Sequence, residues 1–168
     1  MTANEVLRII SALNDANISV WIDGGWGVDA LIGQQTREHE DLDLVIALAN
    51  VETVKDILGK QGFVVLEDEL PTRIVLKGVN AQHIDFHAVT FDIEGGAIQR
   101  LQDGSVYKYK LEGLNGNGSI NGHAVKCITP EEQAASHYGY EPDEKDKHDM
   151  QLLQKHFGIE LTKPYFSS

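Results

Sequence analysis

The sequence holds a single cysteine and lacks any long hydrophobic run. Cys127 alone excludes an internal disulfide framework and a cysteine-rich zinc site. No apolar stretch approaches the roughly 20 residues needed to cross a bilayer. Residues 1–20 also lack the basic start and cleavage site of a signal peptide. We therefore expect a cytoplasmic protein with no membrane partner.

Basic residues are scarce as well. Fourteen lysines and arginines stand against 26 aspartates and glutamates, which gives a formal net charge of −12. Because phosphate backbones attract basic surfaces, this balance argues against a nucleic-acid partner. It suits a cationic small molecule, although an acidic surface also serves solubility.

The chain does have enough apolar material for a core. Hydrophobic residues make up 42% of its 168 residues, which is one domain by size, or one domain with a small helical appendage. We expect residues 1–128 to form the core and residues 129–168 a helical part packed on it. The chain shows no internal repeat or low-complexity segment.

Hydrophobic periodicity predicts the order helix, strand, helix, strand, helix and then a run of strands. Thr2 and Glu5 form a capping-box pattern before the first helix, and Asn50 is expected to cap the third. This order is typical of an α/β (α+β) fold, a mixed sheet flanked by helices on one side with a short helical C-terminal part. The predicted strands are 18–22, 41–48, 63–66, 72–77, 83–89, 106–110 and 123–128.

Two segments lack a clear pattern. Residues 91–122 hold much of the glycine and are expected to form a partly irregular excursion over the sheet around the strand at 106–110. The tail, residues 159–168, is expected to be loose.

Chemistry is concentrated in one stretch that joins a glycine pair to two aspartates. Gly24 and Gly25 follow an apolar strand and open a short helix, and Asp41 and Asp43 lie two residues apart on the next strand. Alternate residues of a strand share a face, so the two carboxylates point the same way. Two carboxylates beside a glycine backbone, which an anion can approach closely, favour the binding of hard divalent cations and phosphate.

A third carboxylate lies on a later strand. Asp85 shares a face with His83 and His87, while Ile84 and Phe86 face the core. If this strand pairs beside 41–48, Asp85 joins the two earlier aspartates. Each aspartate alone would be read as a solvated strand residue, but the combination favours a site that activates a nucleoside triphosphate through metal ions.

Four segments together resemble the small antibiotic nucleotidyltransferases of the DNA polymerase β superfamily. The resemblance is closest to the short lincosamide nucleotidyltransferases, with the aminoglycoside 2″-nucleotidyltransferases next. It runs from about residue 5 to residue 155 and is weak in 91–122. The segments are Asp23-Gly-Gly-Trp-Gly-Val-Asp-Ala-Leu, Thr36-Arg-Glu-His-Glu-Asp-Leu-Asp-Leu44, Ile84-Asp-Phe-His87 and Cys127-Ile-Thr-Pro-Glu-Glu-Gln.

The resemblance implies a reaction and roles for the residues. Such enzymes move a nucleoside monophosphate, usually from ATP, onto a drug hydroxyl and release pyrophosphate. Asp41 and Asp43 would be ligands of Mg²⁺, and Asp85 the third ligand or the general base. Gly24 and Gly25 would hold the triphosphate through backbone N–H groups.

Three basic side chains are candidates for phosphate contact. By the resemblance, Arg37 and His39 in the loop before Asp41 would reach the nucleotide, although an exposed loop arginine is as often only solvated. Arg73 would meet triphosphate oxygens if its strand neighbours the acidic cluster. A charge that protects an edge strand against aggregation is the equal alternative for Arg73.

The sequence thus predicts a magnesium-dependent transfer of AMP from ATP to a hydroxyl of a lincosamide. An aminoglycoside is the second candidate acceptor and suits the acidic charge better. A protein-AMPylating enzyme and a nucleotide-binding protein without turnover are the remaining alternatives. We also expect a homodimer, because 168 residues is small for a complete acceptor pocket.

Overall fold

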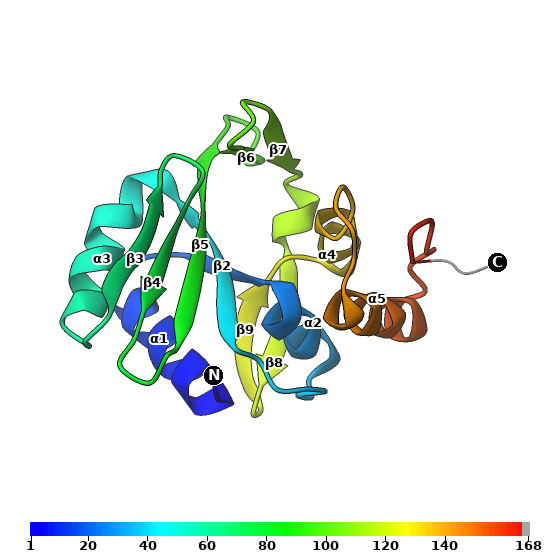
Figure 1. Ribbon diagram of the computed structural model, residues 1–168, viewed down its shortest axis with the longest axis horizontal. Coiled ribbons are helices and arrows are strands. Elements are labelled where there is room, and N and C mark those ends of the chain that lie inside the picture. The colour runs from blue at the N-terminus through cyan, green and yellow to red at the C-terminus, as the bar shows by residue number, and fades with distance from the viewer. Residues whose placement is uncertain (166–168) are drawn as a thin grey trace.

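The computed structural model describes residues 1–165. Its single mixed sheet runs in the order β3-β4-β5-β2-β1-β9-β8, and β6 and β7 extend it from the end of β5 (Figure 1). The strands are β1 (Val20–Asp23), β2 (Asp41–Ala47), β3 (Val64–Glu69), β4 (Arg73–Lys77), β5 (His83–Phe91), β6 (Ala97–Arg100), β7 (Val106–Tyr109), β8 (Gly116–Ile120) and β9 (His123–Cys127). The helices are α1 (Ala3–Asp15), α2 (Gly24–Ile32), α3 (Val51–Gly59), α4 (Pro130–Ser136) and α5 (Glu144–Phe157), with short 3₁₀ turns η1 (Leu48–Asn50) and η2 (Glu112–Leu114).

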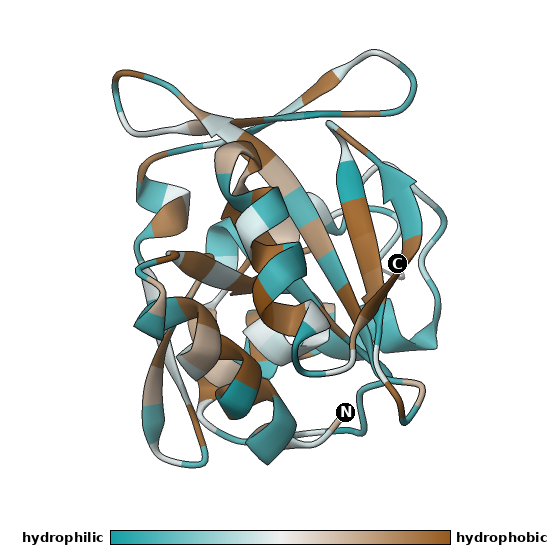
Figure 2. Ribbon diagram, turned by 90° about the vertical axis from the view of Figure 1, so that its left-hand side faces the viewer, coloured by the Kyte–Doolittle hydropathy of each residue, from teal (hydrophilic) through white to brown (hydrophobic). Residues whose placement is uncertain are grey.

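The sheet buries one face under α1, α2 and α3. Leu42, Leu44 and Ile46 of β2 pack there with apolar residues of all three helices in the main core. Figure 2 shows the hydrophobic stretches of the strands beside the helices that cover this face. The alternate residues Asp41 and Asp43 point to the opposite face. This arrangement confirms the predicted fold class, a mixed sheet flanked by helices.

The C-terminal helices pack on α2 and not on the sheet face. Val28 of α2 forms a small apolar cluster with Met150 of α5 and with Leu161. The Tyr165 hydroxyl donates to the His137 carbonyl at 2.6 Å. The prediction of a loose tail is therefore wrong for residues 159–165, while residues 166–168 lie outside the described residues. No helix within residues 1–165 has both the length and the hydrophobicity that a membrane span requires.

Part of the segment expected to be irregular is instead the regular hairpin β8–β9. Asn121 and Gly122 both have positive φ, 49° and 77°, which is the two-residue turn that matches strand twist. The glycines of β8 serve close packing. A Cβ on Gly116 would overlap the Cys127 carbonyl, and one on Gly118 would overlap the Ala30 carbonyl of α2. Glycine density here marks close approach of backbones and not a loop.

The two predicted helix caps have different outcomes. Thr2 and Glu5 form the reciprocal capping box as predicted. Asn50 does not cap α3, because its backbone is already helical (φ −95°, ψ −8°) and its side chain makes no capping bond. The turn η1 runs straight into α3, so the helix needs no side-chain cap at that position.

Candidate active site

The predicted carboxylates meet where β2 and β5 pair. The two strands are parallel, and their register sets Asp43 beside Asp85 and Asp41 beside His83. On the other side of β2, antiparallel β1 sets Asp23 beside Asp43. Residues in register project to the same face, so the aspartates gather on the open face of the sheet. Asp23 was missed from the sequence, and its only signal was its place directly before the glycine pair.

Asp43 and Asp85 form a cluster with His87. One potential ligand atom from each lies within 4.8 Å of the others. His87 Nε2 is 3.9 Å from Asp43 Oδ1, and its Nδ1 is 3.1 Å from the Gln99 amide nitrogen. Asp41 lies outside this cluster but lines one pocket together with Asp43 and His87. The arrangement therefore places Asp41 at the exposed end of the acidic face.

The electrostatics of this face suit a divalent cation. Burial raises the pKa of Asp43 well above its usual range, and the charges of Asp41, Asp23 and Asp85 raise it further. Among the described residues, the buried Asp85 Oδ1 has no hydrogen-bond partner. Mg²⁺ prefers oxygen ligands, and these neighbouring carboxylates include the Asp85 oxygen atom that lacks such a partner. A bound cation would also reduce the repulsion between the carboxylates.

Arg73, the first residue of β4, is held by carboxylates of the two neighbouring strands β3 and β5. Its Nη1 donates to Asp85 Oδ2 at 2.6 Å, its Nε to Glu69 at 2.7 Å and its Nη2 to Glu67 at 2.6 Å. Hydrogen bonds to Glu69 and Asp85 raise the pKa of Arg73. Because three carboxylates already compensate its charge, this geometry favours orientation of Asp85 over the predicted contact with phosphate.

Gly24 and Gly25 open α2 directly against the acidic face. Gly24 has a φ of 58°, and a Cβ at this position would overlap the carboxylate of Asp43. Its N–H donates to Asp23 Oδ1 at 2.7 Å, so this expected phosphate donor is already paired. The Gly25 N–H, in the first turn of the helix, has no intrahelical acceptor and is the better placed of the two.

Two pockets flank the acidic face and share Asp23, His87 and Ser136. The first, which we call the helix-start pocket, has a volume of about 390 Å³. The second, the tyrosine pocket, lies between β5–β7 and α4 and has a volume of about 590 Å³. The helix-start pocket is lined further by Gly24, Gly25, Arg37, Asp41, Asp43, His137, Tyr140, Asp143, Lys145, Asp146 and Asp149. The tyrosine pocket is lined further by Thr72, Arg73, Gln99, Leu101, Gln102, Asp103, Tyr107, Tyr109 and Tyr138.

The start of α5 supplies several residues that sequence reasoning missed. Lys145 and Asp149 are among them, and both line the helix-start pocket. Lys147 of the same helix instead pairs with Glu144 at 2.7 Å on the exposed side of α5. The capping box of Asp143 marks where the helix begins, but nothing in the sequence indicates which of its faces meets the pocket.

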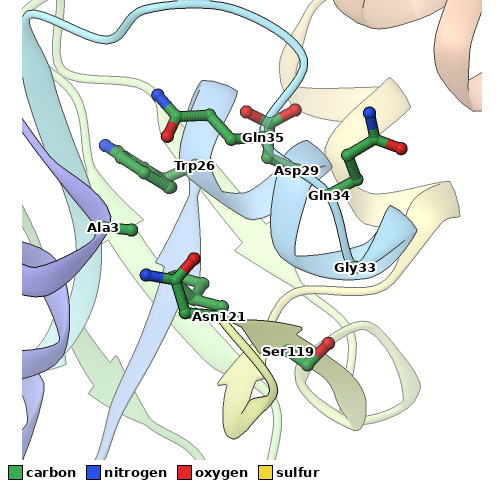
Figure 3. A pocket seen from close by; sticks show the side chains of 9 residues that line it. Ala3, Trp26, Asp29, Gly33, Gln34, Gln35, Ser119 and Asn121 are labelled. Atoms are coloured by element: carbon green, nitrogen blue, oxygen red, sulfur yellow. The ribbon is translucent and has the colours of Figure 1, made fainter.

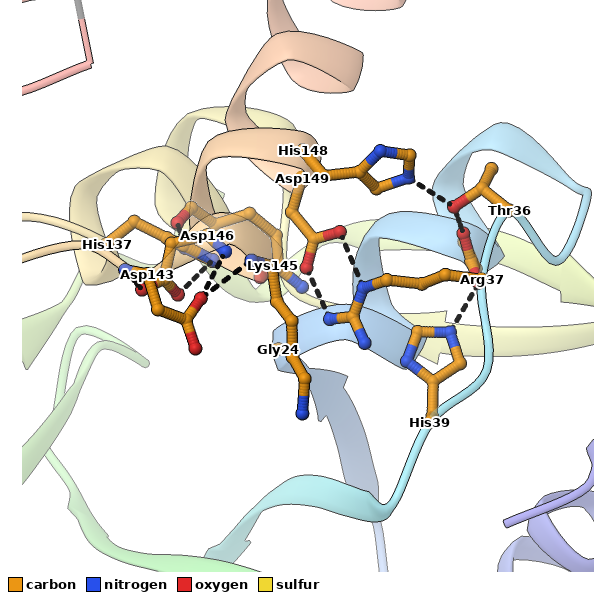
Figure 4. Close-up of polar contacts among 12 residues, drawn as sticks. Gly24, Thr36, Arg37, His39, His137, Asp143, Lys145, Asp146, His148 and Asp149 are labelled. Atoms are coloured by element: carbon orange, nitrogen blue, oxygen red, sulfur yellow. Dashed lines mark hydrogen bonds and ion pairs between the residues drawn. The ribbon is translucent and has the colours of Figure 1, made fainter.

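The loop before β2 is fixed by one ion pair and one buried histidine–carboxylate hydrogen bond (Figure 4). Arg37 binds Asp149 of α5 through Nε (3.1 Å) and Nη2 (2.7 Å). His39 Nε2 lies 2.5 Å from Asp29 Oδ2 of α2, and the His39 ring packs on Trp26. His39 is only 4% exposed, so it lies beneath Gly25, and the structure does not place it in the pocket where phosphate contact was predicted.

A third cavity lies away from this chemistry. It has a volume of about 220 Å³ and sits between α2, the start of α1 and the β8–β9 turn (Figure 3). Trp26, Gln34, Gln35 and Asn121 line it, and its carboxylate Asp29 is already bound by Thr36 and His39. We therefore assign the chemistry to the acidic face.

Comparison with known proteins agrees with this geometry. The fold that carries the acidic face is shared with a lincosamide antibiotic adenylyltransferase, which places the protein among the nucleotidyltransferases. The sequence profile of the aminoglycoside-2″-adenylyltransferase family matches residues 5–153, and the chain belongs to this family.

Individual relatives differ in how much of the chain they match. A lincosamide resistance protein of Staphylococcus haemolyticus is 28% identical over 92% of this chain and 95% of its own. A 2″-aminoglycoside nucleotidyltransferase of Escherichia coli is 36% identical, but over only 31% of each chain. The lincomycin-bound crystal structure of the lincosamide adenylyltransferase LnuA superimposes with a TM-score of 0.82 at 28% identity, covering 92% of this chain and 97% of LnuA. The structure of ANT(2″)-Ia with adenylyl-2″-tobramycin shares the fold, with a TM-score of 0.74 at 21% identity over 93% of this chain and 89% of its own.

Proposed function

We propose that this enzyme transfers AMP from ATP, with Mg²⁺, to a hydroxyl of a lincosamide antibiotic and releases pyrophosphate. The observation that carries the proposal is the parallel pairing of β2 and β5. It sets Asp43 beside Asp85 in front of the glycine pair that opens α2. The proposal also draws on the family to which the chain belongs.

The helix-start pocket suits the triphosphate. Its floor is the N-terminus of α2, where the helix dipole and the Gly25 N–H favour an anion. Arg37 and Lys145 line the same pocket and add positive charge. These groups offset the surrounding carboxylates at the place where phosphate oxygens would lie.

Asp41 and Asp43 would hold Mg²⁺, which when bound would neutralise phosphate oxygens and stabilise the leaving pyrophosphate. In the reaction, the acceptor oxygen forms a bond to the α-phosphorus, and the bond from that phosphorus to the β-phosphate bridging oxygen breaks, its electron pair leaving with pyrophosphate. The acceptor proton passes to Asp85, whose Oδ1 has no partner within the described residues. Arg73 holds the other oxygen of Asp85 and so orients it.

The tyrosine pocket suits the acceptor. It adjoins His87 and Asp23, and Tyr107, Tyr109 and Leu101 give it an apolar lining. A lincosamide carries few charges and fits such a surface better than a polycation does. The likeness to the lincosamide resistance protein, over 92% of the chain, supports the same acceptor. An aminoglycoside is the second candidate, favoured by the net charge of −12.

Pyrophosphate release from Mg-ATP tests the proposal, measured with lincomycin, with kanamycin and without a drug. We expect release with lincomycin only. Release with kanamycin only would assign the second candidate. Absence of release with both would reject an antibiotic acceptor of these classes, and labelling of protein by ATP without a drug would identify an AMPylating enzyme.

A further inference from the structure

One face of α5 is fastened to the loop that leads into β2. His148 Nε2 lies 3.2 Å from the Thr36 hydroxyl and Asp149 binds Arg37 (Figure 4). Lys145 Nζ also donates to Glu40 at 3.0 Å. Positions 145, 148 and 149 are three and four residues apart, so they lie on one face of the helix. The C-terminal helix therefore reaches the acidic site through this loop.

The contact between Arg37 and Asp149 leaves part of the guanidinium unused. Asp149 is 2% exposed and takes one N–H from Nε and one from Nη2, while Nη1 donates to the Glu38 carbonyl at 3.2 Å. A guanidinium has five N–H groups. Three are therefore engaged, and two have no recorded partner in residues 1–165.

The unused donors lie beside the start of α2. Arg37 lines the helix-start pocket, its side chain is 21% exposed, and its Nη2 packs so closely on Gly25 that a Cβ there would overlap it. We propose that Asp149 is a positioning residue that holds the Arg37 guanidinium beside Gly25, so that its two remaining N–H groups bind the triphosphate. The inference rests on the proposed function, because it concerns the same nucleotide pocket.

The charges around Arg37 explain why Asp149 is needed to position its guanidinium. Arg37 is attracted by Asp41 as well as by Asp149. Without Asp149, its long side chain would turn toward the carboxylates proposed to hold Mg²⁺ and compete with the ion. A charge pair is rarely the most stabilising way to fill a buried position, since apolar residues of similar volume often serve as well. The Arg37–Asp149 pair is therefore better explained by orientation of Arg37 than by stability.

The test is the affinity for Mg-ATP, measured by calorimetry without any acceptor, together with the thermal midpoint of each variant. We expect Asp149→Asn to raise the Kd of Mg-ATP about tenfold, because it loses a charge-assisted bidentate contact. Arg37→Ala should have a similar or larger effect. The double variant should bind no more weakly than Arg37→Ala alone, because Asp149 acts only through Arg37. Asp149→Asn should also need a higher Mg²⁺ concentration for nucleotide binding.

Lys147→Ala is the matched control, since Lys147 lies on the same helix but pairs only with Glu144 outside the pocket. Its Kd should equal that of the wild type. A Kd for Asp149→Asn within twofold of the wild type, or additive effects in the double variant, would overturn the inference while leaving the proposed function intact.

If Asp149→Asn does not fold, the variant Arg37→Lys is measured in its place. A lysine keeps the positive charge but lacks the planar guanidinium that binds two acceptors at once. An unchanged Kd of Mg-ATP for Arg37→Lys would therefore equally overturn the inference. A wild type that does not bind Mg-ATP would reject the proposed function and the inference with it.

Discussion

At the scale of single residues, Asp43 is the point where the acidic face converges. It lies beside Asp23 on one strand and beside Asp85 on the other, and Gly24 must lack a side chain to leave it room. Alternation along β2 predicted that Asp41 and Asp43 share a face, whereas Asp85 joins them only because β5 pairs with β2, and Asp23 was missed. The pairing of Arg37 with Asp149 could not be predicted, because 112 positions separate them and no local pattern links them.

Replacing the aspartates separates metal binding from proton transfer. Asp43→Asn removes a ligand charge, so turnover should fall by on the order of 100-fold or more with Mg-ATP binding weakened. Asp85→Asn should lose turnover to a similar extent but keep nucleotide affinity closer to the wild type. Pyrophosphate release and calorimetry measure the two effects, with thermal midpoints as the check on folding. Near wild-type rates in either variant would contradict the assignment.

The raised pKa of Asp43 predicts a pH-dependent stability without metal. Burial and neighbouring aspartates favour its protonated form in the folded state, so above about pH 4 the Asp43 carboxyl is protonated to a greater extent in the folded chain than in the unfolded chain. The contribution of Asp43 to stability therefore falls as the pH rises from its unfolded pKa to its raised folded pKa. In EDTA, Asp43→Asn should match the wild type near pH 4 and exceed its thermal midpoint at pH 7.5, by about 3 °C for each kcal/mol recovered. A constant difference between the two pH values would contradict this explanation.

At the scale of elements, local sequence patterns predicted the structure correctly where tertiary packing favours the same helix or strand. The capping box of Thr2 and Glu5 and the apolar alternation of β2 each predicted the observed structure. Strand β9 was predicted, but its hairpin partner β8 was missed because the glycines of β8 suggested a loop. Their cause is long-range, since Gly118 touches the Ala30 carbonyl of α2, and no window around residue 118 contains that contact.

The close approach at Gly118 predicts a large effect from a small substitution. Gly118→Ala places a methyl group against the backbone of α2, which cannot yield as a side chain would. We expect a loss of about 1–3 kcal/mol in the free energy of unfolding, measured by urea denaturation. Gly59→Ala is the control, because no atom lies within 4 Å of its added Cβ and helix propensity improves. Equal stability of the two variants would show that β8 can move away from α2.

At the scale of the whole molecule, the net charge of −12 and the apolar tyrosine pocket favour different acceptors. Long-range attraction acts on any polycation that approaches, whereas the pocket lining acts only after contact. Salt distinguishes the two, because it screens exposed charges and leaves apolar contact largely unchanged.

Ionic strength should therefore have little effect on the apparent affinity for the proposed acceptor. Raising it from about 50 to about 500 mM should change the KM for lincomycin by no more than about twofold at saturating Mg-ATP. A polycationic acceptor bound by the acidic surface would show a rise in KM of about tenfold or more over the same range. Steady-state kinetics at several salt concentrations, with ATP saturation verified at each, measures the difference.

The lone Cys127 provides a built-in reporter of unfolding. It is fully buried opposite Ile22, and burial raises the pKa of its thiol to about 12. The folded chain should leave a thiol reagent such as Ellman's reagent unreacted, and each unfolded chain should release one equivalent of chromophore. The slow labelling rate under native conditions then gives the free energy needed to part β9 from β1, at the strand that ends beside the acidic face.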